Sequence, residues 1–153
     1  GEGEEARTRP ALPRAVQGRL QHCLFRVILR FPRKGGARPP AMIHSATGAQ
    51  LDAWRREPRW TGLELESKGG GGRVVVGDPG LTACGPLVGF VSNGGYDVLA
   101  GHSVAIGMCA ATSIVELLQG PCNLGRNARG PLLLMVRNVT SRQFRPALAT
   151  VRA

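Results

Sequence analysis

Residues 85–111, GPLVGFVSNGGYDVLAGHSVAIGMCAA, are the stretch that decides the fold. Residues 87–92 are apolar and rich in side chains that favour β-strands, and residues 96–99 resume that pattern after Asn93, Gly94 and Gly95. Asn and Gly accept the positive φ that a tight turn requires. The pattern therefore predicts a β-hairpin that turns at residues 93–95, with its two glycines in a structural role.

Strand patterns extend on both sides of this hairpin. Gly107 lies within the apolar run 103–111, and its missing side chain indicates a bulge or the close approach of a neighbouring backbone. Residues 23–31 alternate, with Phe25, Val27, Leu29 and Phe31 on one face and Arg26 and Arg30 on the other. Further short strands are predicted at residues 41–44, at residues 132–136, and from residue 144 or 147 to residue 151.

One helix is predicted among these strands. Thr47 can cap a helix over residues 48–56, where Leu51 and Trp54 share one face. Many short strands separated by Gly and Pro turns predict a mainly β, β-rich α+β domain, an antiparallel β-barrel with one short helix. We assign residues 22–153 to this domain. Residues 1–21 are charged, Pro-bearing and aperiodic, which predicts a flexible linker.

Composition favours a polyanionic partner. Lys and Arg number 20 against 10 for Asp and Glu, for a formal net charge of +10. Nucleic acid therefore leads, and an anionic membrane surface is the weaker alternative. Neither a membrane span nor a signal peptide is visible, so no membrane partner is expected. The chain begins with Gly, and we expect it to be a piece of a longer protein.

The motifs of several enzyme and cofactor classes are missing. The four cysteines and three histidines do not stand at metal-ligand spacing, so no metal is expected. Lys68 precedes a run of four glycines with no hydroxyl after it, which fails the phosphate-loop pattern and indicates a flexible loop. His102 has no orienting partner, while Asp78 and Asp97 fit turns. No catalytic residue is predicted in this chain.

Two basic segments are the candidate binding sites. The first is the Gly-Pro loop after residue 31, with Arg33, Lys34 and Arg38, and the second is VRNVTSRQFRPA, with Arg137, Asn138, Arg142 and Arg145. Guanidinium groups form bidentate hydrogen bonds with phosphate oxygens, and neutral donors can bond to phosphate or 2′-hydroxyl groups. The competing interpretation of the second segment is a solvated turn whose arginines pair with Glu64, Glu66 or Glu116. We expect Phe144 to belong to the core.

Three stretches carry a family resemblance. Residues 89–107, residues 133–147 and the upstream VILRFPRKGGARPPAMIH resemble the C-terminal domain of the largest protein subunit of eukaryotic ribonuclease P and RNase MRP. The resemblance covers residues 23–153. That domain is itself similar to the C-terminal barrel of the glycine-cleavage T-protein, so both likenesses imply the same fold.

The resemblance implies a non-catalytic RNA-binding scaffold of the ribonuclease P and RNase MRP ribonucleoprotein. It would support tRNA 5′-end maturation and rRNA processing by holding the catalytic RNA, in the nucleus and nucleolus. Expected partners are that RNA, the other protein subunits and, indirectly, pre-tRNA. No cofactor is expected on this chain, and Mg²⁺ is expected on the RNA.

Two alternatives stay open. The first is a C-terminal fragment of a folate-dependent aminomethyltransferase, although the T-protein ending lacks the V-R-N-x-x-S-x-x-x-R-P pattern of residues 136–146. The second is a protein-interaction domain within a ribonucleoprotein, in which the basic charge gives general affinity for RNA.

Overall fold

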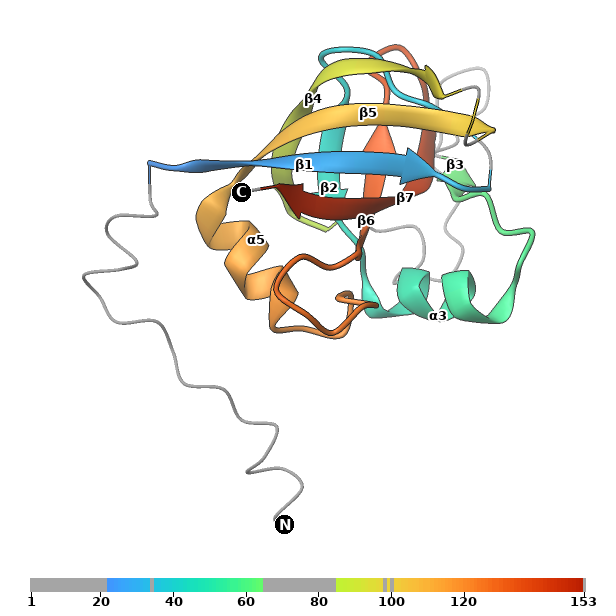
Figure 1. The fold of residues 1–153 in the computed structure, drawn as a ribbon. Helices are drawn as coiled ribbons and strands as arrows, with labels where there is room; N and C mark the ends of the chain where they lie inside the picture. Colours follow the sequence, from blue (N-terminus) through green and yellow to red (C-terminus); the bar gives the residue numbers. More distant parts are fainter. Residues whose placement is uncertain (1–21, 34, 65–84, 98, 100, 153) are drawn as a thin grey trace, which may run out of the picture.

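The structure is a computed structural model that describes residues 22–33, 35–64, 85–97, 99 and 101–152 (Figure 1). The expected linker, Lys34, Asp78 and the glycine run lie outside these residues. The elements, in chain order, are β1 (Leu24–Phe31), β2 (Met42–Ser45), α3 (Gly48–Arg56), β3 (Leu63–Glu64), β4 (Leu87–Asp97), β5 (His102–Ala110), α5 (Ala111–Leu118), β6 (Leu132–Arg137) and β7 (Gln143–Arg152).

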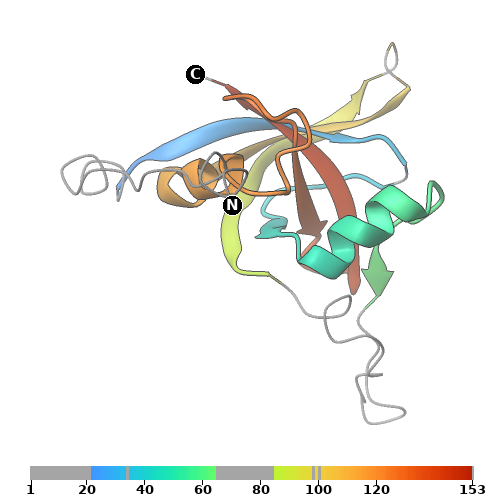
Figure 2. The same ribbon diagram turned by 90° about the horizontal axis from the view of Figure 1, so that it is seen from below.

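Six of the strands close into an antiparallel barrel, which confirms the predicted fold. Their order is β1-β5-β4-β2-β6-β7, and pairing of β7 with β1 completes the circle. The short strand β3 pairs with the start of β7. Both helices lie below the barrel in Figure 1 and face the viewer in Figure 2.

Alternating side chains of each strand fill the barrel. In β1, Val27 and Leu29 are fully buried and Phe31 is 2% exposed, whereas Arg26 and Arg30 are exposed, as their alternation predicts. The strand β6 is buried on both faces from Leu132 to Val136, because one face lines the barrel and the other is covered by α3 and the loops beside it. These buried residues give the barrel a continuous apolar core.

The helix α3 begins as its sequence predicts. The Thr47 hydroxyl accepts a hydrogen bond from the Gln50 backbone N–H at 3.2 Å, and the Gln50 side-chain oxygen accepts one from the Thr47 N–H at 2.8 Å. This reciprocal pair satisfies two donors that the helix itself cannot pair. Leu51 then packs against Cys122 and Leu133, with Trp54 beside them.

Replacing Thr47 with Ala is expected to lower the free energy of unfolding by about 1 kcal/mol, because the hydroxyl half of the capping box is lost. Urea denaturation followed by circular dichroism measures the change. A Thr47→Ser variant keeps the hydroxyl and is expected to retain most of the stability. Equal stability of the Ala variant and the wild type would show that the cap contributes nothing.

Two local predictions are wrong. Residues 93–95 do not turn: they continue β4, which has a bulge between Val91 and Asn93, and the chain reverses after Asp97, with Gly101 at a φ of 73°. Neither Gly94 nor Gly95 has a positive φ. Gly94 is needed for another reason, since an added Cβ would collide with the Ala37 carbonyl oxygen of the first loop.

The second correction concerns helix content, because the structure contains α5 in addition to the predicted α3. The chain passes directly from β5 into α5, and no side chain caps the new helix. Ile114 is fully buried in the barrel core and Leu117 and Leu118 pack beside it. Across the described ranges, neither helix has the length and apolar character needed to span a membrane.

Candidate nucleic-acid interface

Asn138 joins the two basic segments, which are about 100 residues apart in the sequence. Its side-chain oxygen accepts a hydrogen bond from the Arg38 backbone N–H at 2.8 Å, and its amide nitrogen donates to the Gly36 carbonyl oxygen at 3.0 Å. The first loop is therefore fixed against the turn between β6 and β7. Two predicted sites become one surface.

A hollow of about 350 Å³ opens beside this junction. Glycines allow a ligand to approach the backbone closely, and three of them border the hollow. Its lining comes from the first loop, the second half of β4, the start of β5 and the β6–β7 turn: Gly36, Ala37, Arg38, Gly94, Gly95, Ser103 and Asn138.

Three of the predicted arginines surround the Asn138 junction. Arg38 is exposed and lines the hollow, and Arg142 is exposed in the adjoining turn. The side chain of Arg145 lies against Gly35, where an added Cβ would collide with the Arg145 Cδ. Gly35 also has a φ of 120°, which L side chains rarely adopt. The loop therefore requires a glycine here.

Arg33 makes a different set of contacts. One terminal nitrogen donates to the carbonyl oxygens of Glu57 at 2.7 Å and Trp60 at 3.2 Å, and the other donates to the Trp54 carbonyl at 2.6 Å. The guanidinium carbon lies 3.6 Å from the centroid of the Trp54 ring. Burial lowers the pKa of this guanidinium. Arg33 thus caps the C-terminal end of α3, where carbonyl groups lack helical partners.

Arg137 is also bound within the protein. Its guanidinium donates to the Ser141 carbonyl oxygen at 2.8 Å, contacts the Met42 sulfur at 3.8 Å and lies 5.5 Å from the Phe144 ring centroid. Its Nε atom is buried and finds no hydrogen-bond partner within the described part of the chain. Phe144 is 2% exposed, which confirms that it belongs to the core.

The competing interpretation, a turn whose arginines pair with nearby acids, does not describe Arg137. Arg137 bonds to a backbone carbonyl of its own turn rather than to Glu64 or Glu116. Glu66 lies outside the described residues, so a pairing with it is untested. Asp97 takes the predicted turn role, because its carboxylate accepts a hydrogen bond from the Leu99 N–H at 3.0 Å.

Tyr96 is a residue that the sequence analysis did not single out. It is 63% exposed and lies opposite Ser103, which lines the hollow. Exposed aromatic rings are surfaces on which unpaired bases stack. Tyr96 is the single tyrosine of the chain. The predicted turn at residues 93–95 placed it in the returning strand, so its position beside the hollow could not be predicted.

Groups suited to metal binding do not gather on this surface. Of the residues that the structure describes, no three His, Cys, Asp or Glu side chains come close enough to hold an ion. The His102 ring nitrogen Nδ1 lies 3.1 Å from the Ser103 carbonyl oxygen, at the start of β5. The surface thus offers guanidinium groups, amides and an aromatic ring rather than a metal-ligand set.

Comparison with protein families identifies the domain. The model of the POP1 C-terminal domain matches residues 82–153. These residues belong to the POP1 C-terminal domain family. The match contains β4 to β7 and the Asn138 turn, whereas the first basic loop precedes it. It indicates a subunit of ribonuclease P and RNase MRP, and thereby favours that family over the aminomethyltransferase. No curated protein matches the chain.

Proposed function

We propose that this domain is a non-catalytic RNA-binding scaffold module, and that it holds the RNA of ribonuclease P or RNase MRP at the hollow beside Asn138. In this role it supports tRNA 5′-end maturation and rRNA processing in the nucleus and nucleolus. The observation that carries the proposal is the Asn138 junction, which brings the basic first loop and the basic β6–β7 turn together beside one glycine-lined hollow.

The arginines divide into two roles. Arg38 lines the hollow, Arg142 belongs to the adjoining β6–β7 turn, and Arg145 lies against Gly35 of the first loop. These three would contact phosphate oxygens, for which a guanidinium fork is well suited. Arg33 and Arg137 donate hydrogen bonds to backbone carbonyl oxygens, so they position the first loop and the β6–β7 turn. Lys34 stays a candidate for a phosphate contact because it belongs to the same loop.

Neutral groups would add a preference for RNA over a general polyanion. Tyr96 offers a ring for an unpaired base next to the hollow. The Ser103 hydroxyl lies at the same edge and can bond to a 2′-hydroxyl. Mg²⁺ would be carried by the RNA, and the chain would supply no cofactor.

Substitution of Arg38, Arg142 and Arg145 by Ala in the full-length protein is expected to weaken binding to ribonuclease P RNA. The slope of log affinity against log salt should become shallower by about two units. For each phosphate contact that is lost, the RNA keeps roughly 0.7–0.9 counterion that binding would otherwise release. Binding is measured at several salt concentrations.

The matched control removes the same charge elsewhere, through Arg55→Ala, Arg56→Ala and Arg59→Ala in and after α3. That variant is expected to keep most of the wild-type slope. Circular dichroism checks that both triple variants are folded. If the Arg38, Arg142 and Arg145 variant has the same salt slope as the α3 control, these arginines do not contact RNA and the proposed site is wrong.

A further inference from the structure

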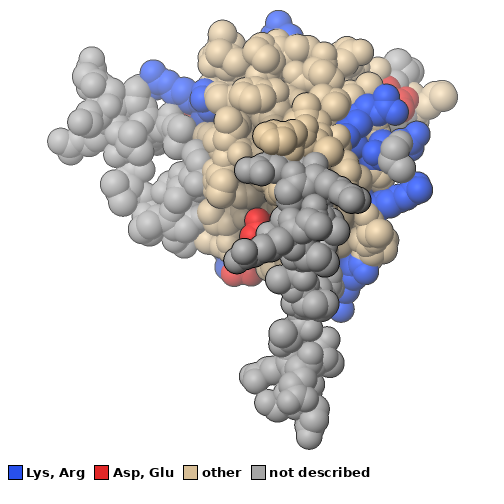
Figure 3. All heavy atoms as spheres, turned by 90° about the vertical axis from the view of Figure 1, so that its left-hand side faces the viewer, with Lys and Arg blue, Asp and Glu red and all other residues tan. Residues whose placement is uncertain are grey.

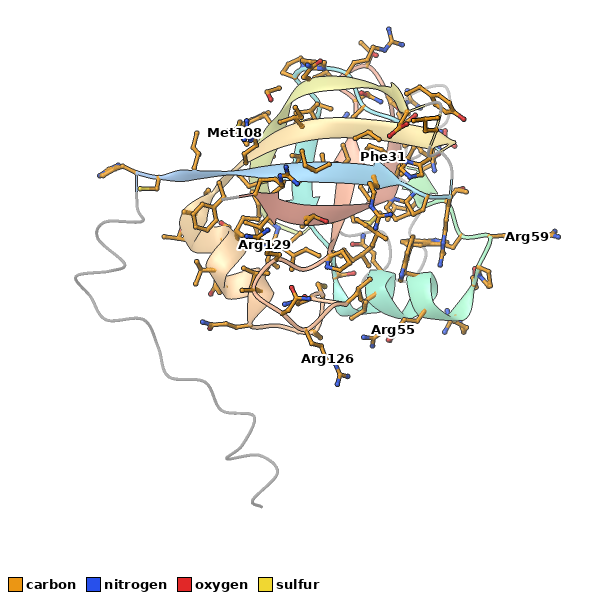
Figure 4. All side chains as sticks on the ribbon, in the orientation of Figure 1. Phe31, Arg55, Arg59, Met108, Arg126 and Arg129 are labelled. Carbon is orange, nitrogen blue, oxygen red and sulfur yellow. The ribbon has the colours of Figure 1, made fainter. Side chains whose placement is uncertain are left out.

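A row of side chains crosses the outside of the barrel away from the hollow. Strand register places Met42 opposite Phe90, Phe90 opposite Met108, and Met108 opposite Arg26. The neighbours of Phe90 in β4, Gly89 and Val91, are buried, whereas Phe90 itself is 47% exposed. The row therefore lies on the outer surface, where Figure 4 shows Met108 on the barrel wall.

A second row extends this surface. Ile106 precedes Met108 by two positions in β5 and pairs with Ile28 of β1. Both isoleucines are partly exposed. Side chains directly opposite each other in a sheet have Cβ atoms about 4.5–5.5 Å apart, and diagonal neighbours are within about 8 Å. Five residues thus form one outer apolar face: Ile28, Met42, Phe90, Ile106 and Met108.

Arginines border this face on one side. Arg26 of β1 lies directly opposite Arg152 of β7, and both side chains are exposed. Like charges directly opposite in a sheet repel each other. No Asp or Glu occurs in β1, β5 or β7, and the one carboxylate of β4, Asp97, is at the end opposite His102. Figure 3 shows this side of the molecule as mostly uncharged, with blue Lys and Arg side chains and a few red acidic side chains around it.

The composition of the face favours a protein over RNA. Two of its members are methionines, whose flexible thioethers adapt to other apolar side chains. The face has one aromatic ring, whereas surfaces that bind unpaired bases use several aromatic rings along the path of the nucleic-acid strand. Contiguous apolar patches are uncommon on isolated domains and mark interaction sites. An acidic side chain of a partner would relieve the repulsion between Arg26 and Arg152.

We propose that the outer apolar face docks an apolar segment of a second protein subunit, with acidic side chains of that segment paired to Arg26 and Arg152. The proposal goes beyond the proposed RNA contact and uses none of the residues that line the hollow. The domain would then have two faces, a glycine-lined surface for RNA and an apolar surface for protein.

The test replaces Phe90 with the photoreactive amino acid p-benzoylphenylalanine in the full-length protein within the assembled ribonucleoprotein. Irradiation is expected to yield an adduct with a second protein that survives ribonuclease treatment and is lost on proteolysis. The same replacement at Met108 provides an independent site on this face. Tyr96, also aromatic and exposed, is the matched control beside the hollow, where the proposed function predicts an RNA adduct.

Arg26→Glu combined with Arg152→Glu, in the same photoreactive protein, is expected to reduce the protein adduct at Phe90 by at least about tenfold, because like charges across an interface are strongly unfavourable. The Tyr96 adduct should be unchanged by these substitutions. A ribonuclease-sensitive adduct at Phe90 and Met108, a crosslink within the chain, or no adduct at either position in correctly assembled particles would overturn the proposal. So would a protein adduct that persists undiminished after the charge reversal.

Discussion

Replacing Gly107 with Val is expected to lower the free energy of unfolding by about 1–3 kcal/mol, as overpacking of a filled core does. Gly107 is buried in β5, and a Cβ added there would be 2.6 Å from Ile43 Cδ1 and 3.1 Å from Val27 Cγ2. Real Cβ contacts are seldom this short, so the Ile43 and Val27 side chains must move within a filled core. Urea denaturation and thermal melting, followed by circular dichroism, measure the loss.

Gly95 provides the matched control because it lies in a neighbouring strand and an added Cβ would meet no atom within 4 Å. A Gly95→Val variant is expected to retain wild-type stability. A second control combines Gly107→Ala with Ile43→Val, which removes the Cδ1 atom and should make the Ala change less destabilising than it is alone. If Gly107→Val melts together with the wild type, the packing described around β5 is wrong.

Replacing Arg33 with Ala is expected to lower the free energy of unfolding by about 1.5–3 kcal/mol, the range for loss of a hydrogen bond to a charged group. The variant loses donors to the carbonyl oxygens of Trp54, Glu57 and Trp60, and also the stacking on Trp54. Because the guanidinium is partly buried, these carbonyls are not simply returned to water. Urea denaturation of the full-length protein measures the effect.

Arg38→Ala is the matched control, since it removes an exposed guanidinium from the same loop and keeps the backbone bond to Asn138. It is expected to leave stability within about 0.5 kcal/mol of the wild type. Arg33→Lys should be intermediate, because one ammonium cannot repeat the fork that reaches three carbonyls. Equal stability of the Arg33→Ala and Arg38→Ala variants would contradict the structural role of Arg33.

Features set by local sequence are the ones that could be predicted. The alternation of β1 depends on side chains two positions apart, and the start of α3 depends on Thr47 and its own first turn. Each carries its signal within a few residues. The barrel could be predicted from the number of such strands and from the turns between them.

The two errors in secondary structure have tertiary causes. Asn93, Gly94 and Gly95 have the composition of a turn, but the first loop needs a residue without a side chain at Gly94. The helix α5 has no capping side chain and contains the β-branched residues Thr112, Ile114 and Val115, which lower helix propensity. Burial of Ile114 against the barrel outweighs that preference.

The candidate interface was predicted in its residues but not in their roles. A basic composition identifies both segments, yet nothing local shows that Asn138 bonds to a loop 100 residues away. Likewise, the partners of Arg33 lie in and beyond α3, so its engagement with carbonyl groups depends on the folded barrel. Tyr96 lies opposite Ser103 because β4 continues to Asp97, whereas Gly94 and Gly95 had indicated an earlier turn.

The strand β7 pairs with both β6 and β1, so the barrel closes through the last of the strands that the structure describes. During synthesis, β1 emerges from the ribosome more than a hundred residues before its second neighbour exists, and its edge stays unpaired until then. Such edges can pair with other chains and lead to aggregation. A ribosome that stops before β7 would release a chain with two open strand edges, and we expect that chain to depend on chaperones rather than to persist as a shortened domain.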